Sequence, residues 1–265
     1  FEPVYDSYVP AIELQGGRPV RIALAAPHYR PDWDAVRAVI TPRTRMIMIN
    51  SPHNPTGAVW SAADMAALAA LVAGTDIVVV SDEVYEHIVF DGRPHESCAR
   101  HPELAERSVI VSSFGKTFHV TGWKVGYVLA STALSAEFRK VHQFNVFTVN
   151  TPVQLALADY LQRPERYRDL PAFYQAKRDR FRAALADSRF ELLPCAGTYF
   201  QLAGYRAIRD VPDVAFAEWL TREVGVAAIP ISAFHHDGHD IGVVRFCFAK
   251  HEDTLDAACA RLSAL

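Results

Sequence analysis

The chain of 265 residues is long enough to bury a large hydrophobic core, and its 50% hydrophobic and 22% charged residues are typical of a globular protein. Its formal net charge of −3 argues against nucleic acid or an anionic membrane as the main partner. No apolar run is long enough to cross a bilayer, and no Cys/His spacing indicates a metal site. The four cysteines are therefore interpreted as reduced thiols of a cytoplasmic protein.

The N-terminal part of the chain alternates between extended and helical patterns. We expect a strand end at residues 1–3, a helix at 8–16, a strand at 19–25, a helix at 30–41 and a strand at 44–50. Because strands and helices alternate, the pattern favours an α/β fold built on a parallel sheet.

Two segments next to these strands contain residues of interest. Tyr5 follows the strand end at residues 1–3 and, taken alone, is a packing aromatic under a turn. Residues 50–57, Asn-Ser-Pro-His-Asn-Pro-Thr-Gly, have the composition of a turn. Because this segment directly follows a buried strand, it also lies where ligands bind in open α/β sheets.

The strand expected at residues 77–80 consists of four branched residues, which is typical of a strand buried on both faces. Asp82 follows at its end, and Tyr85 comes shortly after it. A carboxylate in this position either caps the following helix or lies against a bound group, and both interpretations are open from the residues alone. The histidines of the next polar loop lack ligand-like spacing and are interpreted as surface side chains: His87, His95 and His101.

Lys116 lies in a short loop after the strand expected at residues 108–112. A partly desolvated lysine beside a second cation has a lowered pKa and can act as a nucleophilic amine. Lys124 supplies such a cation, or holds a phosphate as a point charge. Ser113 offers a hydroxyl on the same loop. The alternative is that Lys116 is a solvated surface group, as most lysines on such loops are.

A long amphipathic helix at residues 170–187 indicates a connection between two domains, with the boundary near Phe173. The segments beyond it predict a small α+β domain of short strands and helices. Arg245 lies inside one of these strands, at residues 243–248, which is otherwise apolar. Because an unpaired buried guanidinium is costly, Arg245 must meet an anion, which is either an internal carboxylate or a ligand.

Together these segments resemble those of the class I/II aminotransferases, which are pyridoxal-phosphate (PLP) enzymes of fold type I. The family's Ser-x-x-Lys segment, followed eight residues after the lysine by a cation, matches Ser113, Lys116 and Lys124. Its Asn-Pro-x-Gly loop matches residues 54–57, and its Asp-x-x-Tyr motif matches residues 82–85. Among subgroups, the chain is most similar to bacterial methionine aminotransferases and kynurenine aminotransferase-like enzymes.

The resemblance implies a cofactor-binding role for most of these residues. Lys116 would bind PLP as a Schiff base, the internal aldimine, and would act as the catalytic base and acid. Asp82 would keep the ring nitrogen protonated. Asn54 and Tyr85 would meet the phenolate oxygen, and Tyr5 would stack on the ring.

The remaining residues concern the phosphate and the substrate. Ser113 and Lys124 would bind the cofactor, Lys124 at its phosphate, and Arg245 would form a bidentate contact with the substrate α-carboxylate. Relatives that prefer dicarboxylic substrates carry an arginine where this chain has Val146. This difference favours a substrate with an uncharged apolar or aromatic side chain.

The implied reaction is ping-pong transamination of a methionine-like amino acid to its 2-oxo acid. Two alternatives stay open. The first is a PLP-dependent β-lyase acting on cysteine conjugates or cystathionine. The second is an inactive truncated family member or a regulatory PLP-binding domain.

The implied fold is α/β, with a mostly parallel central sheet that has helices on both faces and a small C-terminal α+β domain. Residues 1–172 would form the large PLP-binding domain, and residues 173–265 the linking helix and small domain. Since family members have a longer N-terminal part, we expect the large domain to be incomplete and the chain to be a fragment. Family active sites lie at a dimer interface, so we expect a homodimer that binds amino-acid and 2-oxo-acid substrates, with no metal, nucleic acid or membrane.

Overall fold

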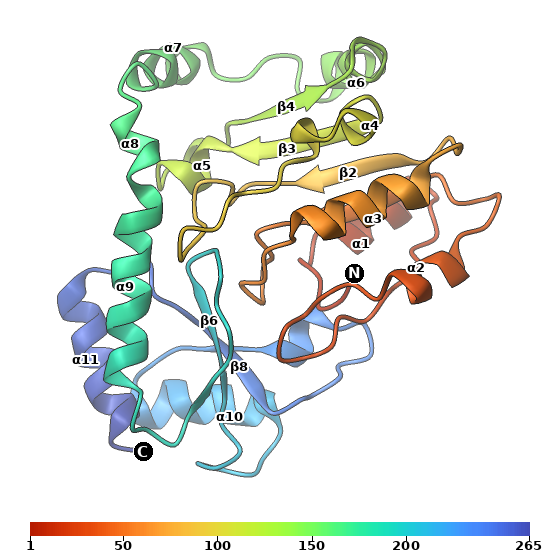
Figure 1. Cartoon of the computed structure of the whole chain (residues 1–265). Coiled ribbons are helices and arrows are strands. Elements are labelled where there is room, and N and C mark those ends of the chain that lie inside the picture. Colours follow the sequence, from red (N-terminus) through yellow and green to blue (C-terminus); the bar gives the residue numbers. More distant parts are fainter. The chain divides into compact units, whose positions relative to one another are not determined.

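The computed structural model describes residues 1–265 and separates into two compact units (Figure 1). Unit 1 comprises Phe1–Asp32, His53–Ala58 and Ala172–Leu265. Unit 2 comprises Trp33–Pro52 and Val59–Pro171. Each unit has its own four-stranded sheet.

The sheet of unit 2 has the strand order β1-β2-β3-β4. Its strands are β1 (Met46–Asn50), β2 (Val78–Asp82), β3 (Ser108–Ser113) and β4 (Gly126–Ala130). The first three run parallel, and β4 runs antiparallel to β3. Figure 1 shows the directions of β2, β3 and β4. The sheet is therefore mostly parallel, as the sequence predicts.

The register of this sheet brings the carboxyl ends of the parallel strands to one edge. Asn50 is paired with Asp82, and Asp82 is paired with Val111. Ser113, at the end of β3, is opposite Gly126, the first residue of β4. Residues that directly follow these strands therefore lie close together, at the edge where open α/β sheets bind ligands.

Helices and buried apolar side chains cover this sheet. The best-defined helix start is that of α3 (Ala62–Val72), where Ser61 and Asp64 form a reciprocal capping box. Leu68 of this helix and Val79 of β2 are fully buried. The other helices are α2 (Trp33–Val39), η1 (Cys98–Arg100), α4 (Pro102–Ala105), α5 (Phe114–Thr117), η2 (Thr121–Trp123), α6 (Thr132–Asn145), α7 (Thr151–Tyr160) and α8 (Glu165–Arg168).

Unit 1 contains an antiparallel sheet of order β5-β6-β8-β7. Its strands are β5 (Glu191–Leu192), β6 (Phe200–Gly204), β7 (Ile229–Pro230) and β8 (Val243–Cys247). Helices pack with this sheet to form a buried core in which Phe216 and Phe248 are fully buried. The helical segments are α1 (Tyr8–Leu14), α9 (Leu170–Ala184), α10 (Asp213–Trp219), the π-helical turn η3 (Leu220–Val224), η4 (Ile231–Phe234) and α11 (Glu252–Ser263).

The compact units differ from the expected domains 1–172 and 173–265 in one respect. The N-terminal segment Phe1–Asp32 and the short segment His53–Ala58 belong with the C-terminal part of the chain. The physical reason is backbone hydrogen bonding: Val4 N donates to Phe234 O over 2.8 Å, and the amides of residues 196 and 197 donate to Gly57 O over 2.9 Å.

The prediction of a strand at residues 19–25 is wrong. Only isolated bridges form there, between Glu2 and Ala23 and between Ala25 and Arg30. The first bridge stays single because Val4, the next residue whose N–H would continue this parallel ladder, donates to the carbonyl oxygen of Phe234 instead.

None of the helices combines the length and the apolar character that crossing a membrane requires.

Candidate active site

Asp82 lies at the carboxyl end of β2, where its backbone is hydrogen-bonded to residues at the end of the neighbouring strand β1. Its carbonyl oxygen accepts hydrogen bonds from Asn50 Nδ2 at 2.9 Å and from Ser51 N at 3.1 Å. Its carboxylate oxygen Oδ1 accepts from Val84 N at 3.1 Å. The carboxylate thus closes a local turn, and its position on the strand is fixed by two bonds to the backbone.

Lys116 lies in α5, directly after β3. Its side chain is half-buried, and Nζ is 5.9 Å from the centre of the Tyr85 ring. Tyr85 is only 2% exposed. Ser113 caps α5, since its Oγ accepts from Gly115 N at 3.2 Å. The structure therefore brings Lys116, Tyr85 and Ser113 together at the end of the sheet.

Gly115 explains why this turn is so tight. A Cβ at this position would lie 2.9 Å from the Cα of Thr121, so only glycine allows α5 and the following η2 to approach so closely. Lys124 ends η2 in the left-handed conformation, with φ +56°. It is exposed and stands two residues before Gly126, which pairs with Ser113. Lys124 and Ser113 therefore belong to the same edge.

Asn54 and Arg245 lie together in unit 1. Arg245 Nη1 donates to Asn54 Oδ1 over 2.5 Å. The guanidinium carbon also lies 4.0 Å from the centre of the Phe200 ring and 4.8 Å from that of Phe234, so it contacts two aromatic rings. Tyr5 also belongs to unit 1, is 41% exposed and contacts Tyr8 edge-on at 5.7 Å between ring centres.

The loop that carries Asn54 is anchored through Gly57. The amides of Ala196 and Gly197 both donate to the carbonyl oxygen of Gly57 over 2.9 Å. Gly57 has φ +72°, and a Cβ there would lie 3.1 Å from the carbonyl oxygen of Gly197. A glycine is therefore required both by the left-handed backbone and by the close approach.

Three comparisons with known proteins bear on this geometry. Residues 1–262 match the model of the family "Aminotransferase class I and II".

The chain belongs to this family.

A methionine aminotransferase from Escherichia coli (strain K12) is 55% identical to this aminotransferase over 266 residues, which cover 100% of this chain and 69% of the relative. A kynurenine–oxoglutarate transaminase 1 from Mus musculus is 34% identical, covering 98% of this chain and 69% of the relative. The crystal structure of YbdL from Escherichia coli, a protein with a methionine aminotransferase function, has a TM-score of 0.98 and 55% identity, covering 100% of this chain and 70% of that one.

Aminotransferases of this family use PLP, and the residues present fit that group. Lys116 supplies a half-buried amine beside the buried Tyr85 ring. Asp82 supplies a carboxylate at the same edge of the sheet for a protonated ring nitrogen. Ser113 and Lys124 supply a hydroxyl and an exposed ammonium group for a phosphate. The donor set therefore has the chemistry that the cofactor requires.

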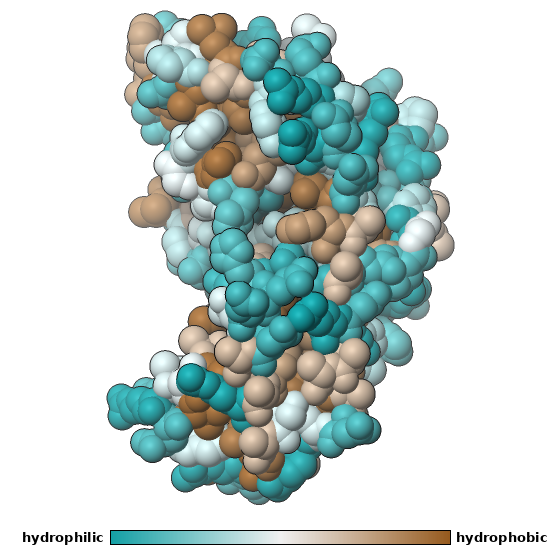
Figure 2. Space-filling model, turned by 90° about the vertical axis from the view of Figure 1, so that its left-hand side faces the viewer, coloured by the Kyte–Doolittle hydropathy of each residue, from teal (hydrophilic) through white to brown (hydrophobic).

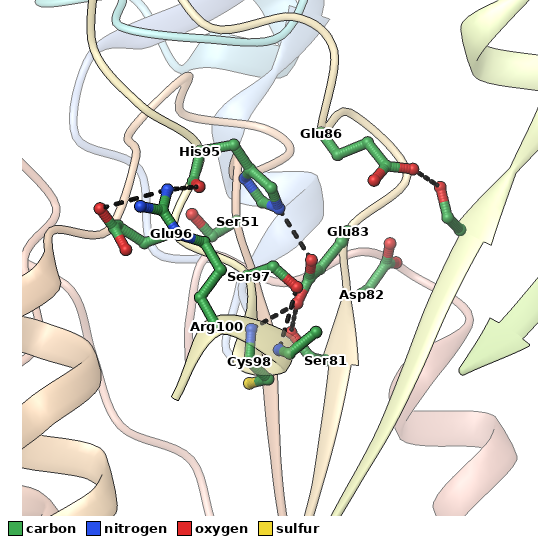
Figure 3. Close-up of polar contacts among 12 residues, drawn as sticks. Ser51, Ser81, Asp82, Glu83, Glu86, His95, Glu96, Ser97, Cys98 and Arg100 are labelled. Carbon is green, nitrogen blue, oxygen red and sulfur yellow. Dashed lines mark hydrogen bonds and ion pairs between the residues drawn. The ribbon is translucent and has the colours of Figure 1, made fainter. Parts of the chain in front are cut away.

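The aminotransferase structure corrects one interpretation of the sequence. Among the loop histidines, His95 is not a surface residue, because its side chain is 13% exposed and pairs with Glu83, whereas the side chains of His87 and His101 are 32% and 21% exposed. His95 Nε2 lies 2.8 Å from Glu83 Oε2 (Figure 3). No sequence signal joins these two residues, because the fold brings them together across a loop.

Proposed function

We propose that this aminotransferase transfers the amino group of an amino acid with an uncharged apolar or aromatic side chain, methionine above all, to a 2-oxo acid by a ping-pong reaction. The observation that carries the proposal is the 55% identity to a methionine aminotransferase over the whole chain. The position of Lys116 beside Tyr85 supports it, because the reaction needs a lysine amine at this edge of the sheet.

Lys116 is the catalytic residue of the proposed reaction. Bound PLP supplies an electron sink for the bonds at the substrate Cα. Lys116 would hold the cofactor through Nζ. Its amine then takes up the Cα proton as a general base and returns a proton as a general acid.

The other side chains hold the cofactor in place. Asp82 would face the ring nitrogen, whose protonation makes the cofactor an electron sink. Tyr85 and Asn54 would donate to the phenolate oxygen, and Tyr5 would pack on the ring. The bond from Arg245 to Asn54 Oδ1 supports this role for Asn54, because it orients the amide so that Nδ2 is on the opposite side.

The phosphate and the substrate need further groups. Lys124 and Ser113 would bind the phosphate from the end of β3 and the turn after α5. Arg245 would bind the substrate carboxylate with its planar guanidinium fork, which packs against the rings of Phe200 and Phe234. Val146 would leave the side-chain site uncharged.

A homodimer in the cytoplasm is part of the proposal. Large apolar side chains are exposed on α6, α7 and the segment between them, which supports a partner surface there. They include Phe138, Val141, Phe144, Phe147 and Leu155. Figure 2 views the side on which α7 lies, and brown hydrophobic atoms interrupt the teal surface in its upper part. The four cysteines are all thiols, which supports a reducing compartment.

The experiment that tests the proposal is product analysis with methionine and a 2-oxo acid. We expect the 2-oxo acid of methionine to appear in step with the amino acid formed from the acceptor. If a cysteine conjugate instead gives pyruvate and a thiol, and methionine gives no oxo acid, the chain is a β-lyase and the proposal is wrong. No turnover of either substrate by a PLP-loaded chain would also contradict it.

A further inference from the structure

Glu83 is a buried carboxylate next to Asp82, the residue proposed to contact the cofactor ring. It is 2% exposed and directly follows Asp82 at the end of β2. Because successive side chains of a strand point to opposite faces, Glu83 cannot face the same side as Asp82. Figure 3 shows the Glu83 carboxylate on the side of Ser81, Cys98 and His95, while that of Asp82 points away from them.

The Glu83 carboxylate closes the loop that follows β2. Its Oε1 accepts from Ser81 Oγ at 2.8 Å and from Cys98 N at 3.0 Å. Its Oε2 lies 2.8 Å from His95 Nε2. One side chain therefore joins the strand before the loop to two residues at its far end. Tyr85 lies within this loop, so its position depends on the same closure.

The backbone of Glu83 joins this cluster to the neighbouring strand. Its N–H donates to the carbonyl oxygen of Val111 over 2.8 Å, and β3 leads directly to Lys116. Its carbonyl oxygen accepts from Glu86 N at 2.9 Å, which fixes the first turn of the loop. The backbone of Glu83 is thus bonded both to β3, which leads to Lys116, and to the loop that contains Tyr85. Its side chain does not face the candidate site.

A carboxylate buried in this way stays charged only if its oxygens keep their hydrogen-bond partners or an opposite charge. Burial alone would raise the pKa of Glu83, but hydrogen bonds from His95, Ser97 and Ser81 and the charge of His95 lower it below its usual range. Glutamine at this position would replace one acceptor oxygen by an N–H donor, so the negative charge and the acceptor for an N–H of His95 would both be lost.

We propose that Glu83, together with His95, is a positioning pair that holds Asp82 and Tyr85 in place against the cofactor. Neither residue touches the cofactor. Both act through the strand end and the loop that they join. The inference rests on the proposed function, since it assigns the pair to the PLP site of that reaction.

The test compares Glu83→Gln with Glu96→Gln as a matched control. Glu96 is also a buried carboxylate of this loop and pairs with Arg100 at 3.8 Å and His101 at 3.4 Å, without the bond to Ser81 of β2 that Glu83 makes. In Glu83→Gln we expect kcat to fall roughly 10- to 100-fold, the range for loss of a residue that orients a ligand-binding group, while KM for methionine changes little. We also expect the pH midpoint of the visible absorbance of bound PLP to shift, because Asp82 no longer lies correctly against the ring nitrogen. Glu96→Gln should shift neither.

A second pair of variants keeps the test decisive if Glu83→Gln fails to fold. His95→Gln retains an N–H donor toward Glu83 and should keep the absorbance midpoint near that of the wild type. His95→Ala removes the donor and should shift the midpoint. If both His95 variants, or both glutamate variants, give the wild-type midpoint, the inference is wrong.

The two proposals fail in different ways. The absorbance titration needs only bound PLP, so it decides the role of Glu83 even if methionine is not a substrate. Wild-type turnover of methionine with no effect of Glu83→Gln would overturn the positioning role and leave the proposed function intact. A wild-type chain that binds no PLP would overturn both.

Discussion

Arg245 Nη1 donates a hydrogen bond to Asn54 Oδ1 over 2.5 Å, joining residues that are 191 positions apart in the chain. In the proposed function, Asn54 contacts the cofactor and Arg245 contacts the substrate carboxylate. The bond therefore couples the two binding events, because a substrate that draws the guanidinium toward its carboxylate also changes the partner of the Asn54 amide.

Replacing Arg245 by lysine should weaken substrate binding. Lysine carries the charge but lacks the planar fork that binds a carboxylate with two hydrogen bonds and packs against the rings of Phe200 and Phe234. We expect KM for methionine to rise roughly 10- to 100-fold, as the loss of a hydrogen bond between charged groups implies. Steady-state kinetics measure the effect. Arg222→Lys, an exposed arginine of the same unit, is the control and should leave KM unchanged.

Replacing Gly57 by alanine should destabilise the Asn54 loop. Gly74 is the matched control, since it also has a positive φ, +68°, but a Cβ added there would meet no atom within 4 Å. Gly74→Ala should cost about 1 kcal/mol for the left-handed backbone alone. Gly57→Ala should cost about 1–3 kcal/mol more, because its Cβ would press on the Gly197 carbonyl oxygen at 3.1 Å and on Cys195 Sγ at 3.3 Å. Urea unfolding compares the two, and equal costs would contradict the packing argument.

Much of the fold was predictable from local patterns, whereas the contacts of the site were not. Runs of branched residues such as residues 78–80 predict the parallel strands, and the residues after them predict the ligand edge. Residues 19–25 look extended in sequence, but their pairing depends on Glu2 and Val4 elsewhere in the chain, and Val4 donates to Phe234 instead. The position of His95 likewise depends on a residue that is not adjacent in sequence, because Glu83 contacts it across a loop.

Lowering the pH should destabilise the protein through His53. This residue is 4% exposed, and burial lowers its pKa to about 3 in the folded state, from an ordinary value of 6.5. The neutral form is therefore favoured by folding. Its contribution to the free energy of unfolding is fully present above about pH 6.5 and falls by about 1.4 kcal/mol per unit as the pH drops toward 3.

The variant His53→Gln isolates this contribution. Glutamine does not titrate, so the difference in unfolding free energy between wild type and variant should shrink between pH 6.5 and pH 3. Denaturant unfolding across this range measures the difference. A difference that stays constant with pH would show that His53 is not neutral in the folded protein.

Introducing arginine at Val146 should change the substrate preference. Val146 directly follows α6 and is 49% exposed, so a longer side chain fits without disturbing a core. We expect kcat/KM for glutamate to rise roughly tenfold relative to that for methionine, since the new cation gives the side-chain carboxylate a partner. Val141→Arg within α6, where Val141 is 69% exposed, is the control. Equal changes for both substrates would argue against a side-chain site at Val146.

The central claim is that Lys116 binds PLP and acts in transamination, and an absorbance titration tests it most directly. Adding PLP to the chain should give a visible band of lysine-bound cofactor, and methionine should then bleach it. The band should be absent in Lys116→Ala and present in Lys140→Ala, an exposed lysine of the same unit that pairs with Glu137. A band that persists in Lys116→Ala, or one that methionine leaves unchanged in the wild type, would contradict the account.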